Sequence, residues 1–218
     1  MTVFLLHNKM KLAFHTLRET SGPKLLLLHG LGEHSRKELS GEVASWPGAV
    51  YALDFTGHGE STIPGGGGYT AELLMGDADV ALGMIGEATV LGRGLGGYIG
   101  LLLAGARPRQ VRGCIIADGH GIAGGGDRPG MPIVRGVAER DTTPDPFALV
   151  ELAADLRPAD YAAKFAQLAA EHSGLDVAVT VSAKARPDWL KAVLAQRGST
   201  EGTVAEGLER YARIAVRI

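Results

Sequence analysis

The sequence is poor in several features that mark particular classes of protein. Its 218 residues include one cysteine, Cys114, so no disulfide can form within the chain. Disulfides accumulate in oxidising compartments, and we therefore expect a cytoplasmic location. The first residues, MTVFLLHNKMKLAFH, lack the basic start and the small-residue cleavage site of a signal peptide.

Long apolar runs and an excess of charge are also missing. The run KLLLLHG at 24–30 is far shorter than the roughly 20 apolar residues that a membrane-spanning helix needs. The formal net charge is −2 at pH 7, which provides no field to attract nucleic acid or an acidic membrane surface. We expect neither a nucleic-acid partner nor a membrane span, and the sequence leaves the oligomeric state open.

Residue patterns that hold metals or dinucleotides are absent as well. No cluster of His, Cys and Asp has the spacing of a metal site. The segment GRGLGG at 92–97 has part of the dinucleotide-binding pattern, but it follows a fourth or fifth predicted strand and lacks the acidic partner. We predict that the protein uses no metal and no cofactor.

The chain does carry a regular alternation of strand and helix patterns. Continuous apolar segments such as AVYALDF at 49–55 are typical of strands buried on both faces. Segments with helical spacing, such as LGGYIGLLLAGA at 95–106, lie between them. Strand–helix–strand repeats with right-handed crossovers give a parallel sheet. We predict a single α/β domain over residues 1–218, with a mostly parallel sheet and helices on both faces.

Some local predictions are more specific. The N-terminal residues are expected to form an antiparallel hairpin that turns at Asn8-Lys9. A polar–apolar helix is expected over 34–48, and a final strand over 214–218, which leaves a shortened C-terminal part. Residues 120–172 contain two amphipathic helices and are expected to form a small helical cap.

Three turns follow consecutive predicted strands: HGLGEHS at 29–35, DFTGHGES at 54–61 and GRGLGG at 92–97. In open α/β sheets, the residues that perform chemistry gather where strands end. Glycines in the first and third turns allow the N–H groups of Leu31 and Leu95 to approach a substrate oxygen. The second turn is interpreted as structural.

Within that second turn, two residues carry specific expectations. The Asp54 side chain is expected to bond the local backbone. His58 is interpreted as a solvated turn residue rather than as a base.

The third turn has the outline of a nucleophile elbow without a nucleophile. Such strand-to-helix elbows hold a strained central residue flanked by small ones. Gly92, Gly96 and Gly97 supply the small residues, whereas the central position holds Gly94, which has no side chain. Glycine relieves the backbone strain that such a position imposes.

The three turns in this order, followed by IIADG at 115–119, make the sequence resemble the α/β-hydrolase superfamily. The first two turns are most similar to its monoacylglycerol-lipase and lysophospholipase branch, and the similarity covers residues 1–119. The resemblance implies acyl transfer by a serine on the elbow, an acid after a later strand and a histidine near the C-terminus.

Each position that the resemblance implies lacks its residue. Gly94 stands at the nucleophile position. After VAVTVS at 177–182, the nearest carboxylate is Asp188 at the start of a predicted helix, and the last histidine of the sequence is His172. We therefore predict a degenerate catalytic triad and a protein that is not catalytic.

Three functions follow as hypotheses. The first is binding of a small carbonyl-containing or anionic ligand, or of a partner. Its cradle would consist of Gly30, Leu31, Arg93, Gly94 and Leu95. The Arg93 guanidinium would favour an anion there, unless it is a surface cation beside the turn. The second hypothesis is weak or unconventional hydrolysis of a carboxylic ester or thioester by an activated water. The third is an interaction protein with a collapsed pocket.

Asp118 and His120 are the candidate residues for the second hypothesis. Both follow the strand that ends in CIIAD, and a His–Asp pair can activate a water. The alternative is that Asp118 bonds backbone N–H groups of its loop while His120 is solvated.

Overall fold

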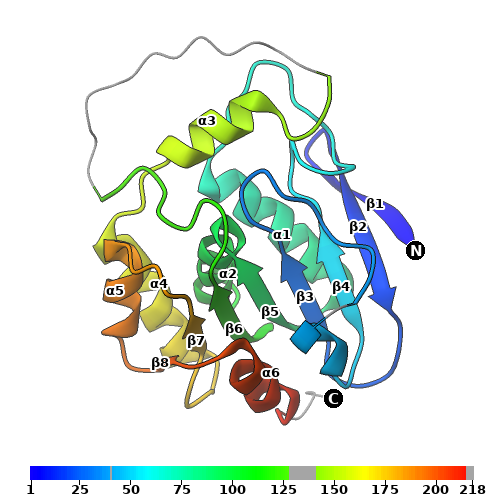
Figure 1. The fold of residues 1–218 in the computed structure, drawn as a ribbon. Helices are drawn as coiled ribbons and strands as arrows, with labels where there is room; N and C mark the ends of the chain where they lie inside the picture. The colour runs from blue at the N-terminus through cyan, green and yellow to red at the C-terminus, as the bar shows by residue number, and fades with distance from the viewer. Residues whose placement is uncertain (40, 128–140, 215–218) are drawn as a thin grey trace.

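The computed structural model describes residues 1–39, 41–127 and 141–214, which contain one eight-stranded sheet (Figure 1). The strands are β1 (Thr2–His7), β2 (Met10–Arg18), β3 (Leu25–Leu28), β4 (Val50–Leu53), β5 (Ala88–Arg93), β6 (Val111–Ala117), β7 (Val179–Ser182) and β8 (Ser199–Glu201). Their order in the sheet is β1-β2-β4-β3-β5-β6-β7-β8. The predicted hairpin, β1 and β2, is antiparallel, as is β2 with β4, and all other neighbours are parallel. The mostly parallel sheet confirms the predicted fold class.

Helices connect the strands and cover both faces of this sheet. They are α1 (Ala71–Ile85), α2 (Leu95–Ala106), α3 (Pro146–Ala154), α4 (Ala159–His172), α5 (Asp188–Leu194), α6 (Val204–Ala212) and the short 3₁₀ helix η1 (Gly41–Ser45). Helices α1, α2, α4 and α5 pack into the core of one face, and η1 and α6 lie against the other. Helix α3 lies across the edge where the parallel strands end (Figure 1).

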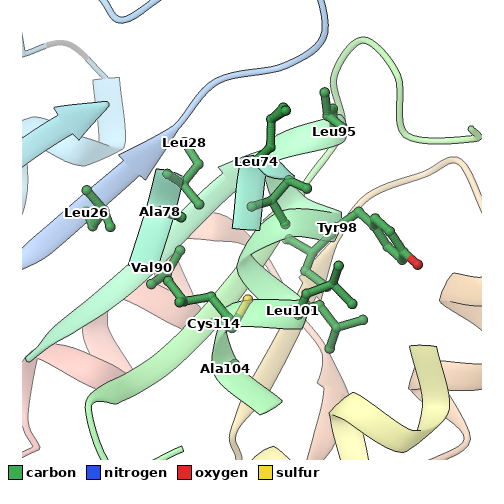
Figure 2. Packing of buried hydrophobic residues seen from close by; sticks show 14 of the residues in the cluster. Leu26, Leu28, Leu74, Ala78, Val90, Leu95, Tyr98, Leu101, Ala104 and Cys114 are labelled. Carbon is green, nitrogen blue, oxygen red and sulfur yellow. The ribbon is translucent and has the colours of Figure 1, made fainter. Parts of the chain in front are cut away.

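The main core lies between the sheet and helices α1 and α2. Leu26 pairs with Val90, and Val90 pairs with Cys114, so the three side chains share one face. A Cβ on Gly100 of α2 would lie 3.1 Å from Val90 and 3.3 Å from Cys114, which shows how closely the helix approaches. Figure 2 shows these strand side chains packed with residues of α1 and α2. Cys114 is therefore a core residue, and burial raises the pKa of its thiol to about 12.

The opposite face is covered less completely, because the helix predicted over 34–48 does not form. In its place the structure has only η1. Gly41, the first residue of η1, has a φ of 58°, in the left-handed region that the interior of a longer right-handed helix cannot contain. The N–H of Ser35 donates to Asp54 Oδ1 at 2.7 Å instead of entering a helical turn. Local hydrogen bonding and one glycine thus override the apolar spacing of this segment.

After β6, the observed helices match the predicted ones, whereas the observed strands differ from the predicted ones. Helices α3 and α4 confirm the two amphipathic helices predicted within 120–172, and α5 begins at Asp188 as expected. Strand β8 is short and polar, so the apolar pattern does not reveal it. Residues 215–218 of the expected final strand lie outside the described residues. Within 120–172, the expected cap region, α3 crosses the sheet edge (Figure 1), whereas α4 packs beside α2. This second contact is close, since a Cβ on Gly105 would lie 2.6 Å from Phe165.

Candidate functional site

The turn between β5 and α2 has the backbone of a tight elbow. Gly94 lies at its apex with φ of 55° and ψ of −117°, a conformation that side chains rarely adopt. A Cβ on Gly92 would lie 2.1 Å from the carbonyl oxygen of Gly96. A Cβ on Gly96 would lie 2.5 Å from the carbonyl oxygen of Leu28. The glycines singled out in the sequence are thus the residues that let the helix leave the strand at this angle.

The two N–H groups predicted as donors point to one acceptor. The Leu31 N–H donates to the carbonyl oxygen of His120 at 3.0 Å, and the Leu95 N–H donates to the same oxygen at 2.9 Å. A pair of converging amide donors is the arrangement that holds a carbonyl or an oxyanion in acyl-transfer enzymes. Here the carbonyl comes from the protein's own main chain.

The segment that carries this carbonyl passes directly over the elbow. A Cβ on Gly94 would lie 2.1 Å from the His120 oxygen and 2.5 Å from the carbonyl carbon of Gly119. A Cβ on Gly121 would lie 2.7 Å from the Cβ of Leu31. We call residues 118–122 the covering loop. It fits only because its own glycines and the elbow glycine have no side chains.

A buried arginine and a tryptophan fix the far end of the covering loop. The carbonyl oxygen of Ile122 accepts hydrogen bonds from Arg157 Nη1 at 2.7 Å and from Trp189 Nε1 at 2.8 Å. The Arg157 guanidinium also lies 4.7 Å from the centre of the Tyr98 ring, a cation–π distance. Helices α2 and α5 therefore help to hold the loop against the elbow.

Glu33 is a site residue that the sequence reasoning missed. Its Oε2 accepts the N–H of Gly30 at 3.1 Å. Its Oε1 lies 3.6 Å from His120 Nδ1 and 3.7 Å from an Arg93 guanidinium nitrogen. One carboxylate thus joins the first turn, the elbow and the covering loop. Its position inside the GEHS segment was the available signal.

Asp118 and His120 engage different partners. Asp118 accepts the backbone N–H groups of Lys184 at 2.7 Å and Ala185 at 3.2 Å. The His120 imidazole is largely exposed and faces Glu33. In the part of the chain that the structure describes, no hydrogen bond or ion pair joins Asp118 to His120.

The second turn holds a buried carboxylate, as its structural interpretation requires. The Asp54 carboxylate accepts hydrogen bonds from His15 Nε2 at 3.1 Å and from the N–H groups of Ser35 and Glu60, at 2.7 and 2.8 Å. Burial by itself raises the pKa of Asp54, but these hydrogen bonds outweigh it and hold the pKa well below its usual range. Asp54 therefore remains ionised and ties β2, the first turn and the second turn together.

Two neighbouring histidines of the first and second turns are buried and neutral, which corrects the interpretation of His58 as a solvated residue. His58 is fully buried, its Nδ1 lies 3.1 Å from the Thr56 carbonyl, and burial lowers its pKa. His29 accepts the Phe55 N–H at Nε2, so its Nδ1 carries the proton and donates to the Gly30 carbonyl. Burial and the neighbouring His58 lower the pKa of His29 to about 3.

Neither a cluster of potential metal ligands nor a helix able to span a membrane is found among the described residues. No group of three or more His, Cys, Asp or Glu side chains among them lies close enough to hold a metal ion. None of the helices described is both long and apolar enough to span a bilayer.

The sheet order, the elbow after β5 and the paired amide donors together define a protein of the α/β-hydrolase class. A family model supports this directly, because that of the alpha/beta hydrolase family matches residues 25–217. The chain belongs to this family. No curated protein matches the sequence.

One solved structure has the same fold over nearly the whole chain. The chain is similar over 94% of its length, and 93% of the other chain, to an N-formylmaleamic acid deformylase from Pseudomonas putida S16, with 13% identity and a TM-score of 0.63. A hydrolase from Pseudomonas aeruginosa PA01 is 26% identical over 53% of this chain, with a TM-score of 0.44. An enol-lactonase from Burkholderia xenovorans LB400 is also 26% identical over 53% of this chain, with a TM-score of 0.45. The chain spans 45% of the length of each of these last two proteins.

Proposed function

We propose that this protein is a non-catalytic member of the α/β hydrolase family that acts by binding another molecule. The observation that carries the proposal is the double hydrogen bond from Leu31 and Leu95 to the carbonyl oxygen of His120. The donors that would stabilise a reacting carbonyl are occupied by the main chain. A substrate would have to displace this carbonyl before it could use them.

The elbow itself adds a second argument. Gly94 offers no atom that can attack a carbonyl carbon. Removing the nucleophile costs about 10⁶ in turnover in a serine protease. The donors alone leave a residual acceleration of roughly 10³–10⁴ over water, and only while they are free to act. Residual activity of that size is a poor basis for a biological role.

The occupied amide donors also limit which ligand the elbow could bind. The amide pair holds a neutral carbonyl in this structure, so a carbonyl ligand at the elbow competes with the covering loop. Arg93 and His120 both face Glu33 rather than an open anion site. The proposal therefore favours a closed elbow, with binding carried by another surface of the protein.

Esterase and labelling assays test the proposal. The purified protein is expected to show no labelling by a fluorophosphonate probe and no turnover of p-nitrophenyl acetate above that of a heat-denatured sample. Turnover that scales with protein and disappears in both Asp118→Ala and His120→Ala would overturn it in favour of hydrolysis by an activated water. Labelling of the intact protein by the fluorophosphonate would overturn it in favour of a serine nucleophile elsewhere in the chain.

A further inference from the structure

The sheet face opposite α1 and α2 contains a cavity, and Arg93 is the residue of the elbow segment 92–97 that lines it. Its volume is about 380 Å³. It opens where the helix predicted over 34–48 is replaced by irregular chain and η1. On this side, the segment around η1 and the start of α6 form the walls, and the strands form the floor.

The floor of the cavity is apolar and continuous across neighbouring strands. Leu27 pairs with Ala52 on one side and with Leu91 on the other, so these three side chains form a row on one face. Ala117 of β6 extends the floor, and Val204 of α6 closes one side. Leu27 and Val204 are only half-buried. Apolar surface left open to solvent inside a concavity is typical of a ligand site.

The rim of the cavity carries charges of both signs. They belong to Glu33, Arg36, Glu38, Glu42 and Arg93. Because acidic and basic groups are interspersed, neither an anion nor a cation gains a uniformly favourable field at the mouth. An uncharged ligand gives up the least hydration free energy when it enters the cavity. Its polar end can still form hydrogen bonds with the rim.

We propose that this cavity binds a small, uncharged and largely apolar molecule. At the ~30 Å³ that each molecule of liquid water occupies, the cavity has room for about a dozen non-hydrogen atoms. A medium-length aliphatic alcohol or a fused aromatic amine has the required size and polarity. The inference rests on the proposed binding function and gives it a location.

A dye titration tests the cavity separately from the elbow. The neutral dye 1-aminonaphthalene is expected to bind saturably, with one molecule per chain and a rise in fluorescence. 1-Decanol is expected to displace the dye more effectively than decanoate or decylamine, which differ from it chiefly in charge. If either charged analogue competes better than the alcohol, the ligand class is wrong.

Variants that fill the cavity locate the binding. Ala117→Leu and Val204→Phe add volume from two different elements and are each expected to weaken dye binding about tenfold, a loss of ~1.4 kcal/mol. Ala205→Leu, on an exposed position of α6 next to the cavity wall, is the matched control and is expected to leave the dissociation constant unchanged. Far-UV circular dichroism of each variant verifies that it is folded.

The outcomes that overturn the inference are distinct from those that overturn the proposed function. Absence of saturable dye binding, or equal binding by both filling variants and the control, removes the cavity as a ligand site. One dye per two chains would instead indicate that a second copy covers this face. The esterase assay tests catalysis at the elbow and does not measure binding in the cavity. Esterase activity would therefore contradict the proposed function without changing the conclusion from the dye titration.

Discussion

At the scale of single residues, Gly94 determines how the elbow is closed. Its φ of 55° lies in the left-handed region, and a Cβ there would lie 2.1 Å from the His120 oxygen. Any side chain must therefore displace the covering loop or distort the turn. Because Gly94 has no side chain, the elbow lacks a nucleophile and also has room for the covering loop.

The variant Gly94→Ser is expected to lower the free energy of unfolding by roughly 3–4 kcal/mol. About 1–2 kcal/mol comes from a non-glycine residue in the left-handed region, and about 1 kcal/mol from each hydrogen bond that the displaced carbonyl loses. Urea unfolding measures the change. Gly86→Ser is the matched control, because Gly86 has a φ of 88° and open space around its Cβ position. Equal losses in the two variants would contradict a role for the covering loop.

At this scale, the sequence predicts contacts that depend on the type of side chain, and it does not predict contacts made by the main chain alone. The glycine spacing of 92–97 correctly predicts a tight elbow, because close backbone contacts demand missing side chains. The hydrogen bonds that occupy the Leu31 and Leu95 N–H groups could not be predicted. Their acceptor in His120 is a main-chain carbonyl, a group that every residue has. Its position depends on the path of the covering loop, which is held by Arg157 and Trp189 far along the chain.

At the scale of elements, apolar spacing succeeds where packing and local geometry agree. Helix α2 begins and ends at the residues predicted for it, because its apolar side chains are buried on all sides. The segment 34–48 has apolar residues at helical intervals, but Gly41 and the bond from Ser35 to Asp54 direct the backbone elsewhere. Strand β8 has no apolar pattern to detect, since its pairing with β7 is made through the backbone.

The approach of α2 to α4 gives a prediction in which two effects oppose each other. Replacing a helical glycine with alanine stabilises a helix by about 1 kcal/mol. At Gly105, however, the new Cβ would lie 2.6 Å from Phe165, and overpacking of a core costs about 1–3 kcal/mol. We expect Gly105→Ala to lower the thermal unfolding midpoint. Gly83→Ala in α1, where nothing lies within 4 Å, is expected to raise it. A rise in both variants would mean that the two helices can separate at no cost.

At the scale of the whole molecule, buried ionisable groups link the loops at the carboxyl edge of the sheet. His29, Asp54 and His58 are each less than a tenth exposed. Asp54 stays ionised because three groups donate to it, whereas the two histidines stay neutral because burial penalises their charged forms. The edge that closes the elbow is thus built from groups whose protonation differs between the folded and the unfolded chain.

This difference predicts a loss of stability in mild acid. The pKa of His29 is 6.5 in the unfolded chain and about 3 in the folded protein, so between these values only the unfolded chain takes up the proton. The stabilisation is complete above pH 6.5 and declines as the pH falls toward 3, by about 2 kcal/mol at pH 5. His58 acts in the same direction, because burial also lowers its pKa.

Urea unfolding between pH 7.5 and 4.5 measures how steeply the free energy of unfolding falls with pH, a dependence that we call the pH slope. His29→Gln is expected to reduce it, whereas His172→Gln, at an exposed site on α4, is expected to preserve it. An unchanged pH slope in His29→Gln would show that other groups take up the proton. In that case acid sensitivity could not be attributed to the histidine that joins the first turn to the second.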